Sequence, residues 1–256
     1  GPMPPVFDSP APLVVFDFDG VLVDGMPEYW WAARTAALQL APRLQLPESA
    51  PAAFGRLRPL IHKGWEMVLM AAELGRDELD IEHLLNDYPA ALASALARWN
   101  WPAGLLQQQL EQVRAGAIGI DEAGWLARHR FYPGVKQRLV RLAEDGAAWA
   151  VLTTKGALFA ARLLEAAGLR PEALFGHEQG SKVEVLRHLQ TQGRPLWFVE
   201  DRRPTLEAVR ADPELAMVRC FLVSWGYLGP GDGQNLPPTI GWLTPEAFSA
   251  PLAQWP

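Results

Sequence analysis

Acidic residues follow two of the apolar runs in this sequence. Asp17 and Asp19 come directly after one run, and Glu200 and Asp201 come directly after another. Carboxylates that meet at one place cannot all stay ionised unless a cation joins them. Every ligand atom offered is an oxygen, and no histidine lies near these residues in the sequence. The set therefore favours a hard cation such as Mg²⁺.

A hydroxyl group and a lysine extend this acidic set. Thr153 and Thr154 follow a third apolar run, and Lys182 opens a predicted helix just before the run that leads to Glu200. A cation, a lysine and a hydroxyl around an aspartate make a site for an anionic phosphoryl group. Each residue also has an ordinary structural interpretation, as a turn residue, a helix cap or a solvated charge. The groups taken together, in this order, favour the chemical interpretation.

Short apolar runs that alternate with helical segments predict the elements that position these groups. Such alternation is typical of a parallel sheet with helices on both faces, and ligands bind at the carboxyl ends of its strands. The fold class predicted is therefore α/β, with a Rossmann-like parallel sheet as its core. The predicted strands are 13–16, 148–152, 173–175, 196–199 and 218–225, and the predicted helices are 135–144, 157–167, 182–190 and 205–210.

The intervening segment 26–130 lacks convincing strand runs and is rich in alanine and leucine at helical spacing. Prolines suit the first turns of its helices, and aspartates suit the caps. We expect an all-helical insert, 26–130, within one core formed by 13–25 and 131–256, and a disordered proline-rich segment 1–12. The predicted insert helices follow Pro27, Pro59 (60–74), Asp77 (to Leu85), Pro89 (90–99), Pro102 (103–115) and Asp121 (122–128).

Composition excludes several classes of protein. The chain has 23 Lys and Arg against 29 Asp and Glu, a net charge of −6, which argues against binding nucleic acid through a basic field. No apolar run approaches the roughly 20 residues of a membrane helix. One cysteine, Cys220, excludes a disulfide framework and leaves an inert buried thiol as the expectation. We expect no signal peptide and a cytoplasmic protein, a monomer or a homodimer.

The ordered motifs resemble those of a known family. Asp17-Phe18-Asp19-Gly20-Val21, then Thr153, Lys182 and Glu200-Asp201 resemble the four motifs of the haloacid dehalogenase-like (HAD) superfamily. The helical insert resembles that family's cap domain. Tyr132-Pro133-Gly134-Val135 and Trp225-Gly226-Tyr227 are similar to sequences of its phosphoglycolate-phosphatase-like branch. The resemblance covers residues 13–228 of the core, and within the insert it covers architecture only.

The resemblance implies a role for each core residue. Asp17 would be the nucleophile of an aspartyl-phosphate mechanism, and Asp19 the acid that protonates the leaving group and later activates water. Thr153 and backbone amides near Phe18 and Thr154 would bind phosphoryl oxygens. Lys182 would offset the negative charge on nucleophile and phosphate.

The implied Mg²⁺ ligands are the Asp17 carboxylate, the Asp19 carbonyl and Asp201, with Glu200 bound directly or through water. The fourth motif often has another aspartate where this chain has Thr205, and Thr154 replaces a frequent asparagine. These departures leave open which acid of the pair binds the metal directly, with Asp201 favoured.

Substrate contacts are expected from the start of one insert helix. Arg58 is the first candidate there and His62 the second, and His62 and Glu66 are expected to share one helical face. A solvated helix face is the alternative for any one of them. Two other polar residues have structural interpretations: Lys155 as a surface residue at a helix start, and Asp24 as a hydrogen-bonding residue in the loop that enters the insert.

The sequence thus predicts a Mg²⁺-dependent phosphatase for a small phosphorylated metabolite, such as phosphoglycolate or a sugar phosphate. A phosphosugar mutase of the same superfamily would use the same motifs and would differ in requiring a bisphosphate. A phosphonate-cleaving enzyme would need a Schiff-base lysine, for which Lys63 is the only insert candidate. A non-catalytic HAD-fold binding protein is the alternative from another class.

Overall fold

The computed structural model describes residues 11–256. Residues 1–10, which hold most of the predicted N-terminal disordered segment, lie outside the described part. The chain divides into two compact units, one of which combines the described residues up to Asp24 with Phe131–Pro256, while the other is Gly25–Arg130. No helix in residues 11–256 is long and apolar enough to cross a membrane.

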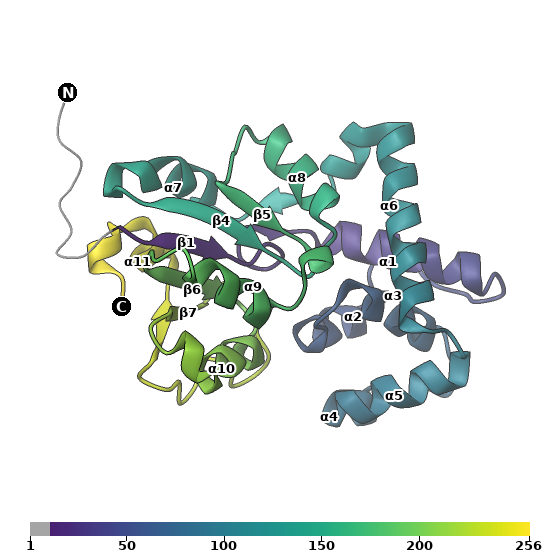
Figure 1. The fold of residues 1–256 in the computed structure, drawn as a ribbon. Coiled ribbons are helices and arrows are strands. Elements are labelled where there is room, and N and C mark those ends of the chain that lie inside the picture. The colour runs from purple at the N-terminus through teal and green to yellow at the C-terminus, as the bar shows by residue number, and fades with distance from the viewer. Residues whose placement is uncertain (1–10) are drawn as a thin grey trace. The chain divides into compact units, whose positions relative to one another are not determined.

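A six-stranded parallel sheet forms the centre of the first unit, in the order β5-β4-β1-β6-β7-β8 (Figure 1). Leu13 of β1 lies opposite Ala148 of β4 on one side and Leu196 of β6 on the other. The carboxyl ends of these three strands therefore meet at one edge, as the α/β prediction requires. The strands are β1 (Leu13–Phe16), β4 (Ala148–Leu152), β5 (Ala173–Phe175), β6 (Leu196–Glu200), β7 (Arg219–Val223) and β8 (Ile240–Leu243).

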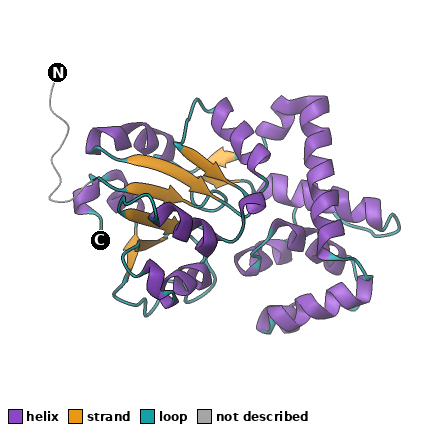
Figure 2. Cartoon of the chain, in the orientation of Figure 1, coloured by secondary structure: helices purple, strands orange, loops and turns teal. Residues whose placement is uncertain are grey.

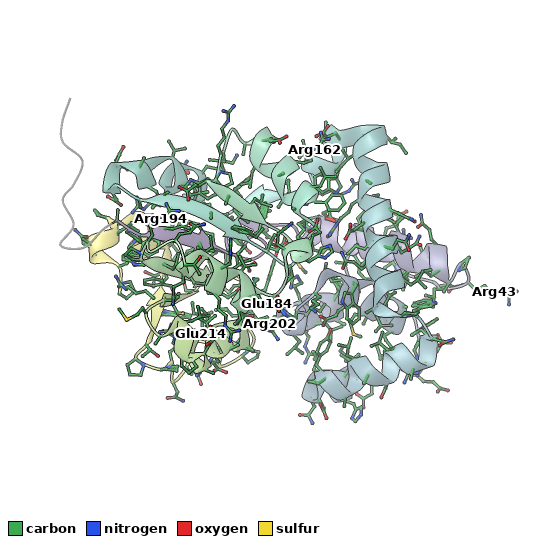
Figure 3. The ribbon with its side chains drawn as sticks, viewed as in Figure 1. Arg43, Arg162, Glu184, Arg194, Arg202 and Glu214 are labelled. Carbon is green, nitrogen blue, oxygen red and sulfur yellow. The ribbon has the colours of Figure 1, made fainter. Side chains whose placement is uncertain are left out.

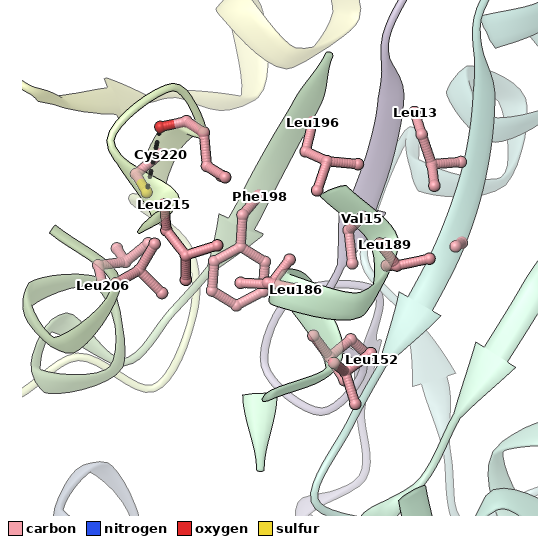
Figure 4. Packing of buried hydrophobic residues seen from close by; sticks show 14 of the residues in the cluster. Leu13, Val15, Leu152, Leu186, Leu189, Leu196, Phe198, Leu206, Leu215 and Cys220 are labelled. Carbon is pink, nitrogen blue, oxygen red and sulfur yellow. Dashed lines mark hydrogen bonds between the residues drawn. The ribbon is translucent and has the colours of Figure 1, made fainter. Parts of the chain in front are cut away.

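Side chains alternate between the two faces of this sheet and are covered on both. Leu13 and Val15 contribute to a buried cluster with residues of α9 and α10 (Figure 4). Phe16 points the other way, against Phe248 of α11, with ring centroids 6.2 Å apart. The helices of this unit are α7 (Val135–Arg141), α8 (Ala157–Ala166), α9 (Lys182–Gln190), α10 (Arg203–Ala211) and α11 (Pro245–Ser249).

The second unit consists of six α-helices and confirms the predicted helical insertion (Figure 2). Its α1 packs on α3 and α6. Buried alanines along α1, among them Ala33 and Ala37, allow this close packing. The helices are α1 (Met26–Leu40), α2 (Ala52–Leu57), α3 (Gly64–Leu74), α4 (Ile81–Asn86), α5 (Tyr88–Trp99) and α6 (Ala103–Leu126).

Some predicted helix starts in the insert were wrong. The helix expected from residue 60 begins at Gly64, because the chain first forms a 3-10 turn, Arg58–Leu60, and then extends through Lys63. Asp80 caps α4 by accepting from two backbone N–H groups, in the role predicted for Asp77. The helix predicted to stop at 115 runs on to a kink at Asp121, whose carboxylate accepts from the N–H of Gly124.

Three strands were not predicted. The edge strand β8 is four residues long and contains Gly241, so it lacks the pattern of a buried strand. The two-residue strands β2 (Val23–Asp24) and β3 (Arg130–Phe131) pair where the chain leaves the first unit and returns to it. The predicted strand 218–225 is shorter, as β7, and contains Cys220, whose burial raises the pKa of its thiol to about 11.

Five short 3-10 helices complete the described structure. They are Arg58–Leu60, Leu142–Asp145, His177–Gln179, Pro213–Leu215 and Leu252–Gln254.

Candidate active site

Three carboxylates gather at the carboxyl edge of the sheet. Asp17 follows β1, Glu200 is the last residue of β6, and Asp201 is the next residue. All three are buried, and each offers a ligand oxygen within 4.8 Å of the others. Mg²⁺ binds oxygen ligands at about 2.0–2.1 Å, which puts the ligands of one ion up to about 4.2 Å apart. Small side-chain rotations would therefore let this all-oxygen set hold such an ion.

Lys182, the first residue of α9, brings a positive charge to these carboxylates. Its Nζ donates to Asp17 Oδ1 at 2.9 Å and to Glu200 Oε2 at 2.7 Å. Burial opposes the charge on Lys182, but the two carboxylates outweigh it and raise the pKa of the ammonium group above its ordinary value. Ser181 caps α9 and so fixes where this lysine begins the helix.

The same charges act differently on the two carboxyl groups. Burial, and then repulsion from Glu200, raise the pKa of Asp17 well above its ordinary value, although Lys182 acts the other way. Burial also opposes the charge on Glu200, but Lys182 and hydrogen bonds outweigh it, and the pKa of Glu200 is lowered. The ionised form of Asp17 is thus disfavoured in this cluster, and a bound cation would stabilise it.

Asp19 is paired with Lys155, which the sequence predicts to be a surface residue. Lys155 Nζ lies 3.2 Å from both carboxylate oxygens of Asp19, and the Lys155 side chain is only 2% exposed. The surface prediction for Lys155 was therefore wrong. A basic residue two positions after Thr153 was the available signal, but it gave no indication that the side chain turns inward.

Thr153 and Thr154 follow β4 at the same edge. Thr153 is buried, and its Oγ1 accepts from the N–H of Lys155 at 3.0 Å. Because α8 begins at Ala157 with Gly156 as its cap, Thr153 shapes the turn and does not cap the helix. Thr154 is partly buried beside it.

The loop after β1 is a tight turn built on Phe18. The carbonyl of this buried residue accepts from the N–H groups of Val21, Leu22 and Val23, at 2.9–3.2 Å. Gly20 has a φ of +86°, and a Cβ there would lie 2.0 Å from Asp201 Oδ2. Only glycine fits at this position, so the turn brings the first acidic loop directly against the second.

Both oxygens of Glu200 accept hydrogen bonds from the protein. Oε2 accepts from Lys182, and Oε1 accepts from the N–H groups of Asp201 and Arg202. Asp201 Oδ2 accepts from the N–H of Tyr227 at 2.9 Å. Tyr227 was known from the sequence only as part of a family-like tripeptide, without a role.

Thr205, which stands where the fourth motif often has an aspartate, is bound by an arginine. Thr205 Oγ1 accepts from Nη1 of Arg202 at 3.0 Å. Arg202, labelled in Figure 3, thus donates to a hydroxyl in the first turn of α10. Arg203, the next residue, pairs with Glu207 at 2.8 Å.

Arg58 and His62 belong to the helical unit. The guanidinium of Arg58 lies 4.9 Å from the ring centroid of Tyr29, and its Nη1 donates to the Ile61 carbonyl. The shared helical face expected for His62 and Glu66 was wrong, because His62 precedes α3. Glu66 turns back to accept from the N–H of Lys63 at 2.6 Å and is buried.

Comparisons with known proteins identify the family to which the chain belongs. A family model described as haloacid dehalogenase-like hydrolase matches residues 11–211. A curated relative, the phosphoglycolate phosphatase of Pseudomonas savastanoi pv. phaseolicola, is 26% identical over 240 residues, which cover 84% of this chain and 70% of the relative.

Solved structures share the fold at lower identity. A predicted phosphoglycolate phosphatase from Haemophilus somnus is 18% identical, with a TM-score of 0.56 and 89% coverage of both chains. Protein tyrosine kinase A of Mycobacterium tuberculosis is 22% identical, with a TM-score of 0.56 and 97% coverage of both. Because these two carry different activities in their names, the likeness supports the fold and not a reaction. With the family model covering most of its length, the chain belongs to the haloacid dehalogenase-like hydrolase family.

Proposed function

We propose that the protein is a Mg²⁺-dependent phosphatase that hydrolyses a small phosphorylated metabolite through an aspartyl-phosphate. The observation that carries the proposal is the buried set of Asp17, Glu200 and Asp201, with Lys182 bridging two of its members. The distant relative named phosphoglycolate phosphatase makes phosphoglycolate the first substrate to test.

The metal would be held by the Asp17 and Asp201 carboxylates and the Asp19 carbonyl. Both Glu200 oxygens already accept from protein donors, which supports Asp201 as the direct ligand of the pair. When bound, the ion would neutralise charge on the transferring phosphoryl group. The all-oxygen donor set and the raised pKa of Asp17 both support a hard cation here.

In the first step an Asp17 oxygen attacks phosphorus, and the bond from phosphorus to the ester oxygen breaks. The leaving alkoxide takes a proton from Asp19. In the second step Asp19 accepts a proton from water as that water attacks the aspartyl-phosphate, which releases inorganic phosphate and restores Asp17.

Three other groups would bind the phosphoryl oxygens. The Thr153 hydroxyl accepts from Lys155 N–H, which leaves its own hydrogen to donate. Backbone amides near Phe18 and Thr154 would donate as well. Lys182 would balance the added negative charge, and Arg58 and His62 are the proposed contacts of the leaving group.

The test is phosphate release from a panel of phosphorylated metabolites, with Mg²⁺ and with EDTA. We expect release only with Mg²⁺, and none from Asp17→Asn. A matched control is Asp80→Asn, which exchanges one good helix cap for another in α4 and should leave release unchanged.

Absence of release from every ester by folded, Mg²⁺-loaded protein would overturn the phosphatase. Release that requires a bisphosphate and yields an isomerised sugar phosphate would replace it with the mutase.

A further inference from the structure

Three consecutive residues after β7, Trp225-Gly226-Tyr227, connect the two acidic loops of the first unit; we call them the clasp. The indole Nε1 of Trp225 donates to the Val21 carbonyl at 2.9 Å. The backbone N–H of Tyr227 donates to Asp201 Oδ2 at 2.9 Å, and its hydroxyl donates to Asp24 Oδ1 at 2.6 Å.

Gly226 shows how closely the clasp is fitted. A Cβ at this position would lie 2.4 Å from Asp201 Cβ and 2.5 Å from the Gly20 carbonyl oxygen. Contacts this short do not occur, so only glycine lets the chain pass between the two loops. The clasp therefore meets Gly20 and Val21 in the loop after β1, Asp24 in β2, and Asp201 in the loop after β6.

We infer that Tyr227 is a positioning residue for cation binding, which ties Asp201 to Asp24 at the last position before the helical insert. The inference rests on the proposed Mg²⁺ site. The backbone of Tyr227 orients one oxygen of Asp201, and its hydroxyl fixes that backbone to β2. An ordered Asp201 loses less freedom when it binds a cation, so the hydroxyl bond should strengthen binding without touching the ion.

The same connection should work in both directions. A ligand that orders the Asp201 side chain should also order Asp24 through Tyr227, because coupling between two sites is reciprocal. Mg²⁺ should therefore slow hydrogen exchange of the backbone amides of residues 21–24 in the wild type.

The test is isothermal titration of MgCl₂ into EDTA-treated protein, without substrate. Tyr227→Phe removes only the hydroxyl, and we expect it to raise the Kd for Mg²⁺ by about three- to tenfold, the effect of one hydrogen bond. Hydrogen exchange of residues 21–24 should lose most of its Mg²⁺-dependent slowing in the same variant.

Tyr88→Phe is the matched control, since the Tyr88 hydroxyl donates to Glu66 at 2.7 Å within the helical unit. It should leave the Kd for Mg²⁺ unchanged. Asp24→Ala removes the other partner of the Tyr227 hydrogen bond. The double variant should bind Mg²⁺ no more weakly than the single variant that has the higher Kd. Asp24→Ala carries the test alone if Tyr227→Phe does not fold.

A Kd for Tyr227→Phe within twofold of the wild type, or full additivity of the two variants, would overturn the positioning role. A wild type that binds no Mg²⁺ would instead overturn the proposed metal site, and with it the phosphatase. The two failures are thus read from different proteins in the same titration.

Discussion

Replacing Lys182 by methionine should destabilise the metal-free protein by about 3–5 kcal/mol, the typical loss when one partner of a buried ion pair is removed. Lys182 contacts Asp17 and Glu200 at 2.9 and 2.7 Å, and all three side chains are at most 9% exposed. At an effective dielectric constant of about 20, each attraction is worth about 6 kcal/mol before desolvation is subtracted. Methionine keeps the volume and leaves two buried carboxylates without their lysine.

Urea unfolding in EDTA, followed by tryptophan fluorescence, measures this loss. Lys136→Met is the control, because Lys136 is exposed and its change should stay within about 0.5 kcal/mol. Added Mg²⁺ should recover part of the loss in Lys182→Met. A loss no greater than that of Lys136→Met would refute the reasoning, because the bridge would then contribute no net stability.

Three further predictions concern the same site. Asp17→Asn should raise the unfolding midpoint of the protein in EDTA, because it removes the carboxylate whose charge burial and Glu200 disfavour. Mg²⁺ at 100 times its Kd should stabilise the wild type by about 2.7 kcal/mol and should leave the stability of Asp17→Asn unchanged. Because the pKa of Asp17 is raised, its contribution to the stability of the metal-free protein is complete below its ordinary pKa and is lost as pH rises through the raised value. Mg²⁺ binds the ionised form of Asp17, so Mg²⁺ should raise the melting temperature more at pH 7.5 than at pH 5. Equal increases at the two pH values would contradict this. Gly226→Ala should lower both the melting temperature and Mg²⁺ affinity, whereas Gly104→Ala in α6, where a Cβ meets nothing within 4 Å, should do neither.

The sequence predicts the α/β fold well because its signals are local. Four apolar residues, 13–16, end at two aspartates, and the same pattern recurs at 196–201, so strand ends and acidic groups are read together. Pro27 and Pro89 mark helix starts because the proline ring suits the first turn, and Pro102 directly precedes the first residue of α6. Pro59 is also a helix-start signal, but it belongs to a 3-10 turn, so the predicted start of the following helix is four residues too early.

Partners far apart in the chain cannot be read this way. Lys155 and Asp19 are 136 positions apart, and nothing local distinguishes this lysine from a solvated one. Tyr227 reaches Asp24 across 203 positions, and Arg114 pairs with buried Glu28 across 86. Each contact depends on how the sheet and helices bring distant segments together, so the folded chain was needed to find it.

The position of β1 in the sheet has a consequence for the order of folding. β1 pairs with β4 and β6 and lies between them, yet it precedes both in the chain, and the whole helical insert separates Leu13 from its partner Ala148. Closing so long a loop slows formation of the central strand pair, because contacts between distant residues form late. We expect the nascent chain to expose this apolar strand until residues 148–152 emerge. The segment that carries Asp17 is thus synthesised before both of its partner strands and pairs only after they have been made.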